Sequence, residues 1–389
     1  MARVVNRRNI LRGSLATVGL SAVTVPAWAW PAIADGETIV PFADMPDVLT
    51  LNTAPDRRII DVRTIDGAFT PADRFFTMQH YGHPVVDAAT FRLRVSGLVT
   101  TALSLSLDDL RRLGGTELIA GFECSGNRRP LQGMSSNGRW TGVPLRAVLE
   151  KAGMQAAARE VVFFGADHGQ EDVEFRTQKI PVDQQFGRSL PRDIAASAAP
   201  FLAWALNGEP LTRHQGSPLR LIVPGWYGVS NVKWLAQIHV QEAQYLGKFQ
   251  ARWYRTLVGE TIDGETKWVE RAVTRMRLKS YIARLTRAGS RCTALIVVLH
   301  DGTPLKAVDV RIDAGPWQPA VPDPRTTSQY SWKLFTYEWK GATPGEHTLV
   351  SRVTDAAGNV QPTERELDNK KTFLEDNSQA PRTVVIPAS

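Results

Sequence analysis

The chain has 389 residues, of which 43% are hydrophobic and 22% are charged, so it is long enough for two domains with cores of their own. Its formal net charge is +7, and four of these charges come from Arg3, Arg7, Arg8 and Arg12. They lie in the first 34 residues, which contain no acidic side chain, so +3 is left for the remainder. No block of lysines and arginines occurs beyond them, and we therefore expect no nucleic-acid binding.

Residues 1–34 have the features of a twin-arginine export signal. Arg7 and Arg8 precede a mildly apolar run, residues 13–25, and two small-residue sites suited to cleavage follow it. The run carries Gly, Ser and Thr and is too short to span a bilayer, so we expect no stable membrane anchor. The twin-arginine translocase carries folded proteins, commonly with a cofactor inserted. The segment therefore predicts a cofactor-containing protein located in the periplasm.

Residues 75–245 mix short apolar strands with helices, which is typical of an α+β domain. Leucines at helical spacing predict a helix over 106–113, and a second helix is predicted over 145–152. Strands are predicted over 91–95, 118–122, 160–164, 219–223 and 235–240. An extended lead-in precedes them, and we assign residues 35–265 to this domain.

After Lys267 the pattern changes to spaced strands separated by turn residues. Strands are predicted over 292–299, 307–312, 330–339 and 346–353. This spacing predicts an all-β, immunoglobulin-like sandwich over 266–389. Cys292 begins the first of these strands, and we interpret it as a core residue without a disulfide partner.

Residues 121–129, Gly-Phe-Glu-Cys-Ser-Gly-Asn-Arg-Arg, contain the most informative motif of the chain. Cys124 follows the predicted strand 118–122 and begins a turn, and Arg128 and Arg129 come shortly after it. Cationic neighbours favour the thiolate, which attacks electrophiles or binds a soft metal. We therefore expect Cys124 to be a ligand or nucleophile. The sequence has no G-x-G-x-x-G after a strand, no Walker A sequence and no H-E-x-x-H.

The Cys-Ser-Gly-Asn-Arg-Arg segment resembles the Cys-x-Gly-Asn-Arg-Arg segment of sulfite oxidases and bacterial sulfite dehydrogenases. Three further segments, 207–211, 216–225 and 231–235, resemble the molybdopterin-binding core of that family in the family's order. Residues 355–362 resemble a signature near the end of its dimerisation domain. The resemblance runs from about residue 75 to 362, and it implies a sulfite-oxidase-type molybdopterin domain followed by a sandwich that forms a homodimer.

The resemblance also implies the residues of the site. Cys124 is expected to bind molybdenum, Arg129 to attract an anionic substrate, and Tyr254 and His80 to orient oxygen ligands or protons. The residues expected to contact molybdopterin are Thr77, Met78, Gln79, His80, Tyr81, Asp167, Gln215, Arg220, Asn231 and Lys233. Arg220 lies in a strand that otherwise reads as buried, where a guanidinium needs an anion such as the cofactor phosphate.

Four positions depart from the family pattern, among them Gln79 in place of an asparagine and Gln215 in place of the histidine of mammalian sulfite oxidases. Met78 stands where sulfite oxidases usually have an arginine that helps to bind sulfite, and Trp253 precedes Tyr254 where the family has aspartate. A methionine cannot hold a dianion, so another cation takes over or the substrate differs. Arg74 and Arg128 are near enough in sequence to be considered for that role.

The leading hypothesis is a molybdenum enzyme that oxidises sulfite to sulfate and passes electrons to an external c-type cytochrome. The chain has no C-x-x-C-H site for a haem of its own. The alternatives are an enzyme with the same cofactor that reduces a sulfoxide, and an exported adhesion protein that uses the sandwich.

Overall fold

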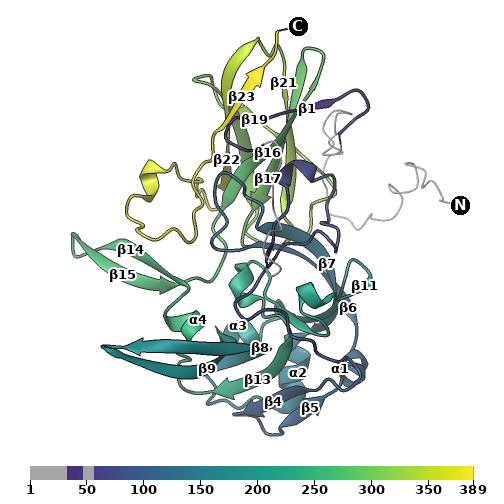
Figure 1. The fold of residues 1–389 in the computed structure, drawn as a ribbon, viewed down its shortest axis with the longest axis vertical. Coiled ribbons are helices and arrows are strands. Elements are labelled where there is room, and N and C mark those ends of the chain that lie inside the picture. The colour runs from purple at the N-terminus through teal and green to yellow at the C-terminus, as the bar shows by residue number, and fades with distance from the viewer. Residues whose placement is uncertain (1–32, 47–56, 389) are drawn as a thin grey trace, which may run out of the picture.

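The computed structural model describes residues 33–46 and 57–388, and the predicted signal peptide therefore lies outside the described residues except at its end. Figure 1 shows a lower part with sheets and short helices and an upper part made of strands. This arrangement confirms the predicted α+β part followed by an all-β sandwich. Within the described residues, no helix is both long and apolar enough to cross a membrane.

Two five-stranded sheets form the lower part. The first has the order β5 (Leu103–Leu105), β4 (Leu93–Gly97), β13 (Leu235–Gln241), β8 (Glu160–Phe175) and β9 (Gln178–Pro191). The second has the order β11 (Glu209–Pro210), β10 (Phe201–Leu206), β7 (Ser135–Pro144) and β6 (Thr116–Glu123), with β12 (Arg220–Ile222) also paired to β10. Strand β8 includes the predicted strand 160–164 and runs eleven residues beyond its end, and β12 lies within the predicted strand 219–223.

The two longer helices follow from their capping and apolar residues. Helix α1 (Leu107–Arg112) begins after Ser106, whose side chain forms a capping box with Asp109. Helix α2 (Leu145–Ala152) ends at Gly153, whose φ of 67° is left-handed and favours glycine. The apolar face of α2 packs into the core of the lower part, which also contains buried side chains of β4, β8 and β13.

Short elements complete the lower part. These are β2 (Arg57–Arg58), β3 (Thr77–Met78), α3 (Arg192–Ala195), α4 (Lys248–Ala251) and the 3₁₀ turns η3 (Arg213–Gln215) and η4 (Gly228–Ser230). The 3₁₀ turn η2 (Val62–Thr64) instead packs against the sandwich, where Val62 is buried in the core. A further 3₁₀ turn, η5 (Arg365–Leu367), lies between the last two strands of the chain.

The upper part is a sandwich of two sheets. One has the order β1 (Thr38–Val40), β16 (Lys279–Ala288), β17 (Arg291–Leu299), β21 (Lys333–Trp339) and β20 (Val321–Pro322). The other has the order β19 (Gln318–Pro319), β18 (Leu305–Ile312), β22 (Gly345–Asp355) and β23 (Arg382–Ile386). Cys292 is fully buried and free, as a core residue. The sequence did not show that β1, from the lead-in, pairs with β16.

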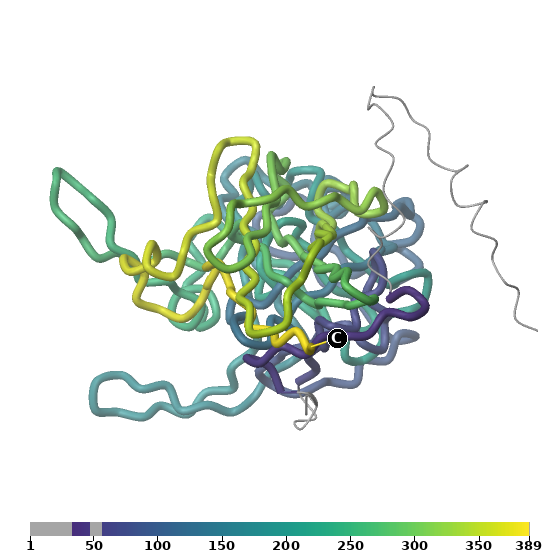
Figure 2. The backbone as a smooth tube through the Cα atoms, turned by 90° about the horizontal axis from the view of Figure 1, so that it is seen from above, coloured from purple at the N-terminus to yellow at the C-terminus, as the bar shows by residue number. Residues whose placement is uncertain are grey.

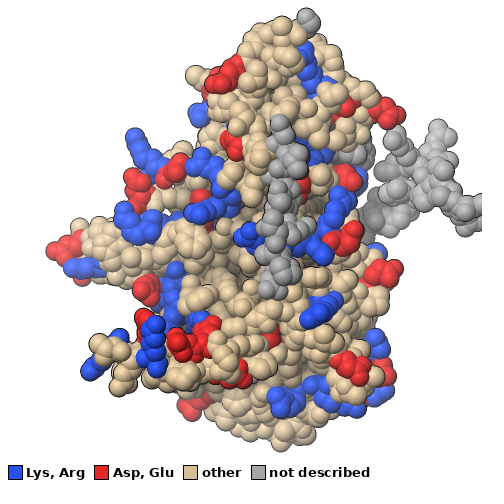
Figure 3. Space-filling view, viewed as in Figure 1, with Lys and Arg blue, Asp and Glu red and all other residues tan. Residues whose placement is uncertain are grey.

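Two hairpins project from the same side of the molecule. One is the outer half of β8 and β9, and the other is β14 (Arg255–Ile262) with β15 (Glu265–Ala272). Helix α4 lies between their bases in Figure 1, and Figure 2 shows that the hairpins diverge. On the face drawn in Figure 3, acidic and basic side chains are interspersed.

Candidate active site

Cys124 lies immediately after β6, in a turn held by backbone and amide hydrogen bonds. The Cys124 N–H donates to the Met134 carbonyl at 2.9 Å, and the Asn127 N–H donates to the Cys124 carbonyl at 2.8 Å. The Asn127 amide donates to Glu123 Oε2 at 2.9 Å, and its oxygen accepts from the Met134 N–H at 3.0 Å. The strand end and the turn together fix where the thiol points.

The thiol opens into a pocket formed by several distant segments. Ten predicted site residues line it, namely Thr77, Met78, Gln79, His80, Cys124, Asp167, Arg220, Asn231, Lys233 and Tyr254. The other lining residues are Phe76, Phe122, Phe186, Gly228, Val229 and Trp234. Residues far apart in sequence therefore converge on one cavity.

Arg220 is a buried cation without a carboxylate partner among the described residues. Its guanidinium donates to the carbonyls of Gln215 at 3.0 Å and Asn231 at 3.2 Å, and Nε has no partner. The Trp140 ring lies 5.0 Å from it. Desolvation lowers the pKa of Arg220 to about 9. An anion beside this guanidinium would offset its desolvation.

Lys233 supplies a second cation to the same cavity. Its ammonium donates to Thr77 Oγ1 at 2.8 Å and to Gln79 Oε1 at 3.0 Å. The close approach of Gly216 to the Lys233 backbone sets its position. A Cβ on Gly216 would lie 2.8 Å from the Lys233 Cα, so only glycine fits there.

Asp167 and Gln79 each have a polar atom that no group satisfies. Asp167 is 4% exposed and its Oδ1 has no hydrogen-bond partner, and neither has Gln79 Nε2. Burial raises the pKa of Asp167 to about 6. Unsatisfied buried polar atoms are rare in native proteins, and their convergence with Arg220 in one pocket fits a bound polar ligand. A planar heterocycle with donors and acceptors, carrying a phosphate for Arg220, fits these groups, and molybdopterin is such a molecule.

His80 and Tyr254 form a hydrogen-bonded pair at the pocket wall. His80 Nε2 lies 2.8 Å from the Tyr254 hydroxyl, and the His80 ring stacks on Phe249 at 4.6 Å. Burial, with Lys248 nearby, lowers the pKa of His80 to about 4. Burial and the nearby Cys124 raise the pKa of Tyr254 far above its ordinary value. At neutral pH the pair therefore consists of a neutral imidazole and a protonated phenol.

The expectation that Arg128 and Arg129 favour a thiolate is wrong. Burial raises the pKa of Cys124, and Glu123 acts in the same direction. Arg128 stacks over the Phe373 ring, 5.3 Å from its centroid, and Arg129 pairs with Glu364 at 2.7 Å. The segment between β22 and β23 thus supplies the partners of both guanidinium groups. A bound metal ion, rather than arginine, would have to supply the positive charge.

Three predicted site residues do not line the pocket. Arg129 makes the ion pair with Glu364 instead of facing the cavity. The Tyr81 hydroxyl donates to Glu171 Oε1 at 2.6 Å. The Gln215 side chain donates to the Ala72 carbonyl at 2.5 Å and so braces the wall of the cavity.

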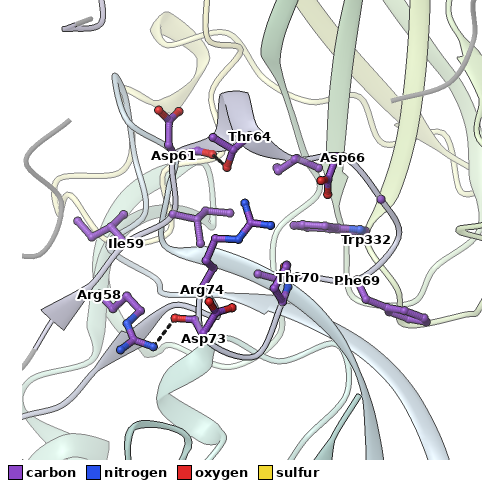
Figure 4. Close-up of a pocket in the computed structure, with 14 residues that line it drawn as sticks. Arg58, Ile59, Asp61, Thr64, Asp66, Phe69, Thr70, Asp73, Arg74 and Trp332 are labelled. Atoms are coloured by element: carbon purple, nitrogen blue, oxygen red, sulfur yellow. Dashed lines mark hydrogen bonds between the residues drawn. The ribbon is translucent and has the colours of Figure 1, made fainter. Parts of the chain in front are cut away.

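Neither candidate replacement for the family arginine enters the pocket. Arg74 projects into a separate cavity, beside Trp332 and Thr64 (Figure 4). Arg128 is held on Phe373. Met78 itself lines the Cys124 pocket. Lys233 and Arg220 are therefore the cations that line it among the described residues.

Sequence reasoning missed two supports of the site. Arg188 on β9 is 1% exposed and donates to the carbonyls of Phe249 and Val273, which fixes α4 under Tyr254. Lys279 on β16 pairs with Glu123 at 3.1 Å, beside the thiol. For Arg188, the available signal in the sequence was its position between Phe186 and Leu190. The second depends on a contact between domains.

The fold and the pocket define a molybdopterin-binding oxidoreductase domain, and comparisons with known proteins agree. A family model described as oxidoreductase molybdopterin binding domain matches residues 80–249. Mitochondrial sulfite oxidase of Homo sapiens is 32% identical over 326 residues, which cover 75% of this chain and 57% of that protein. Sulfite oxidase of Gallus gallus is 30% identical over 331 residues, covering 75% of this chain and 68% of that protein.

The chain belongs to the sulfite oxidase family of molybdopterin oxidoreductases. Its cofactor is accordingly molybdenum held by molybdopterin. A crystal structure of the sulfane dehydrogenase SoxCD from Paracoccus pantotrophus shares the fold, with a TM-score of 0.73 and 21% identity over 99% of this chain and 100% of that chain. The chain spans 57% of the length of the human relative.

Proposed function

We propose that this protein oxidises sulfite to sulfate, a reaction in which sulfite and water give sulfate, two protons and two electrons. The observation that carries the proposal is the convergence of the Cys124 thiol with Arg220 and Asp167, whose buried polar atoms lack partners. When bound, the molybdenum cofactor supplies oxygen-atom transfer and accepts two electrons. The thiolate of Cys124 is its protein ligand, Arg220 would hold the phosphate, and Asp167 the pterin ring.

The chain's own side chains then position the substrate and its protons. The Tyr254 hydroxyl, kept protonated by burial, is available to donate a hydrogen bond to an oxygen of sulfite. The His80 ring is hydrogen-bonded to that hydroxyl, and its stacking on Phe249 fixes the orientation of the imidazole. Lys233 supplies positive charge to the same pocket. Phe186 and Phe122 exclude water from the cavity they line.

The cellular context of the proposal comes from the sequence. The twin-arginine signal supports export to the periplasm by the twin-arginine translocase. The absence of a C-x-x-C-H sequence supports an external c-type cytochrome as the electron acceptor.

The direct test is metal analysis and steady-state kinetics of the purified holoprotein. We expect about one molybdenum per chain and reduction of ferricyanide by sulfite. Cys124→Ser is expected to keep the pterin and lose sulfite oxidation, whereas Arg220→Gln is expected to lose cofactor. Full activity of the serine variant would exclude Cys124 as the metal ligand. A wild-type protein that contains no molybdenum would instead favour the alternative of an exported adhesion protein.

A second candidate, reduction of a sulfoxide such as oxidised methionine, is supported by one observation. Met78 lines the pocket where the family arginine is expected, so the pocket carries less positive charge for a dianion. The complete β-sandwich argues against it, because the sulfoxide reductases resemble the catalytic domain alone. Assays with sulfite, with a sulfane and with methionine sulfoxide, the last using a reduced dye, decide between these substrates.

A further inference from the structure

The outer half of β8 and β9 is a two-stranded ribbon with two different faces. Val173 lies opposite Ile180, and Phe175 lies opposite Gln178. Directly opposed residues of an antiparallel pair share a face, and alternate residues of one strand do so too. Val173, Phe175, Ile180 and Val182 therefore form one face, which we call the apolar stripe.

The outer residues of the stripe are exposed in the single chain, and Val173 and Val182 are half-buried. Phe175 is 60% exposed and Ile180 is 43% exposed. The opposite face carries the polar residues Asp172, Glu174, Lys179 and Asp183. A two-stranded ribbon is only marginally stable alone, and a largely apolar face opposite a largely polar one indicates that something packs on it.

The stripe lies on the side of the ribbon that faces the active site. Glu171 shares its face, because it lies opposite Val182, and Glu171 is paired with Lys248. The Lys248 ammonium lies 3.8 Å from the centroid of the Trp253 ring. Trp253 is 53% exposed, so a protein that packs on the stripe also lies over this indole.

Trp253 connects this surface to the pocket. Its ring meets the His80 ring edge to face, with 5.4 Å between centroids. His80 in turn is hydrogen-bonded to Tyr254, which lines the pocket with Cys124. Contacts from Trp253 through His80 to Tyr254 thus connect the exposed surface with the pocket that contains Cys124.

Two arginines border this surface, whereas most of the acidic residues of the ribbon, Asp172, Glu174 and Asp183, lie on its opposite face. Arg176, in the turn of the ribbon, stacks over Phe175 at 5.7 Å, and Arg252 precedes Trp253. Both are exposed and neither forms an ion pair with a described residue. The acidic Glu171 is neutralised by Lys248 and by a hydrogen bond from Tyr81. A partner with carboxylates around an apolar patch would complement this border.

We propose that the apolar stripe and Trp253 are the docking surface for a one-electron haem protein with an acidic rim. The proposal rests on the molybdenum chemistry of the proposed function. Each encounter takes one electron from the reduced chain and converts one ferric haem to ferrous, so two encounters remove both electrons. Such complexes are small and short-lived, which a narrow stripe with few anchors suits.

The test compares Ile180→Glu, on the stripe, with Lys179→Glu, the adjacent residue on the opposite face. Holoprotein is reduced with titanium(III) citrate, freed of reductant and mixed with a ferric, acidic monohaem cytochrome c at low ionic strength. We expect Ile180→Glu to slow haem reduction at least tenfold and Lys179→Glu to leave it unchanged. Ferricyanide, which needs no docking, should oxidise all three proteins equally. Immobilised cytochrome should show the same ranking of affinities for the oxidised chains.

Each remaining outcome decides the proposal. Equal haem reduction by both variants, or no reaction of the wild-type chain with the cytochrome, overturns it. A dimer that becomes a monomer in Ile180→Glu makes a second copy the occupant and also overturns it. A basic cytochrome that reacts as fast as the acidic one overturns the proposed requirement for an acidic rim on the partner. Because the reductant is titanium(III), failure to oxidise sulfite would overturn the proposed function and leave this docking result standing.

Discussion

At the scale of single residues, the pocket keeps charged groups in an environment that disfavours their charged forms. Desolvation lowers the pKa of Arg220 to about 9 and raises that of Asp167 to about 6. Burial of these groups therefore lowers the stability of the apo chain, and the bound cofactor would offset that loss, as expected for a preorganised site.

Asp167→Asn is expected to stabilise the apo chain at neutral pH and to weaken cofactor retention. The folded pKa of about 6 exceeds the usual 3.8, so the folded chain binds more protons between these values and loses stability as pH rises through them. The two-unit difference corresponds to about 3 kcal/mol at pH 7. The thermal midpoint of the apo variant should exceed the wild type at pH 7 and match it below the usual pKa. A gain that is the same at both pH values would show that Asp167 is not the titrating group.

Met78→Arg is expected to lower the sulfite KM roughly tenfold or more, because one charge-assisted hydrogen bond contributes about 1.5–3 kcal/mol. With a neutral sulfoxide as the substrate, the same cation would impair the native reaction. Met78→Leu is the matched control, since it keeps the apolar lining. Steady-state kinetics with both substrates provide the measurement, and unchanged sulfite kinetics in the arginine variant would show that this side chain does not reach the substrate.

At the scale of elements, a buried ion pair ties β6, which carries the cysteine turn, to β16 of the sandwich. Lys279 Nζ lies 3.1 Å from Glu123 Oε2 and donates to the Asn127 carbonyl at 2.7 Å. Both side chains are 1% exposed, and burial raises the pKa of Glu123. The position of the thiol thus depends on a strand of the other domain.

Lys279→Met is expected to destabilise the chain by about 3–5 kcal/mol, because it leaves Glu123 as an unpaired buried acid. The double variant Lys279→Met with Glu123→Gln removes both charges and should recover much of that loss. Chemical denaturation of the apo proteins measures both. Equal stabilities for the single and double variants would mean that the pair contributes packing alone.

At the scale of the whole molecule, we predict that the sandwich joins two chains with two-fold symmetry, as closed oligomers usually do. Light scattering of the mature protein is expected to give twice the chain mass at micromolar concentrations. Trp332 and Trp339 are buried in the sandwich core, so variants at these residues would test folding rather than the interface. A monomer mass across that concentration range would contradict the prediction.

Much of this protein follows from local sequence patterns. The helix that begins after Ser106, the apolar runs of β12 and β13, and the Cys124 turn depend on residues close in the chain, so periodicity and motif order predicted them. Ten of the residues predicted from the family resemblance line one pocket, because the family motifs mark positions that the fold brings together.

The tertiary structure alone decided where long side chains point. Arg128 and Arg129 follow the cysteine in sequence, yet their guanidinium groups contact Phe373 and Glu364. Arg74 enters a different cavity, and β1 joins a sheet whose other strands begin at Lys279. These outcomes depend on contacts between segments more than two hundred residues apart. Flexible cationic side chains take the partner that such contacts supply, and no local pattern records which partner that is.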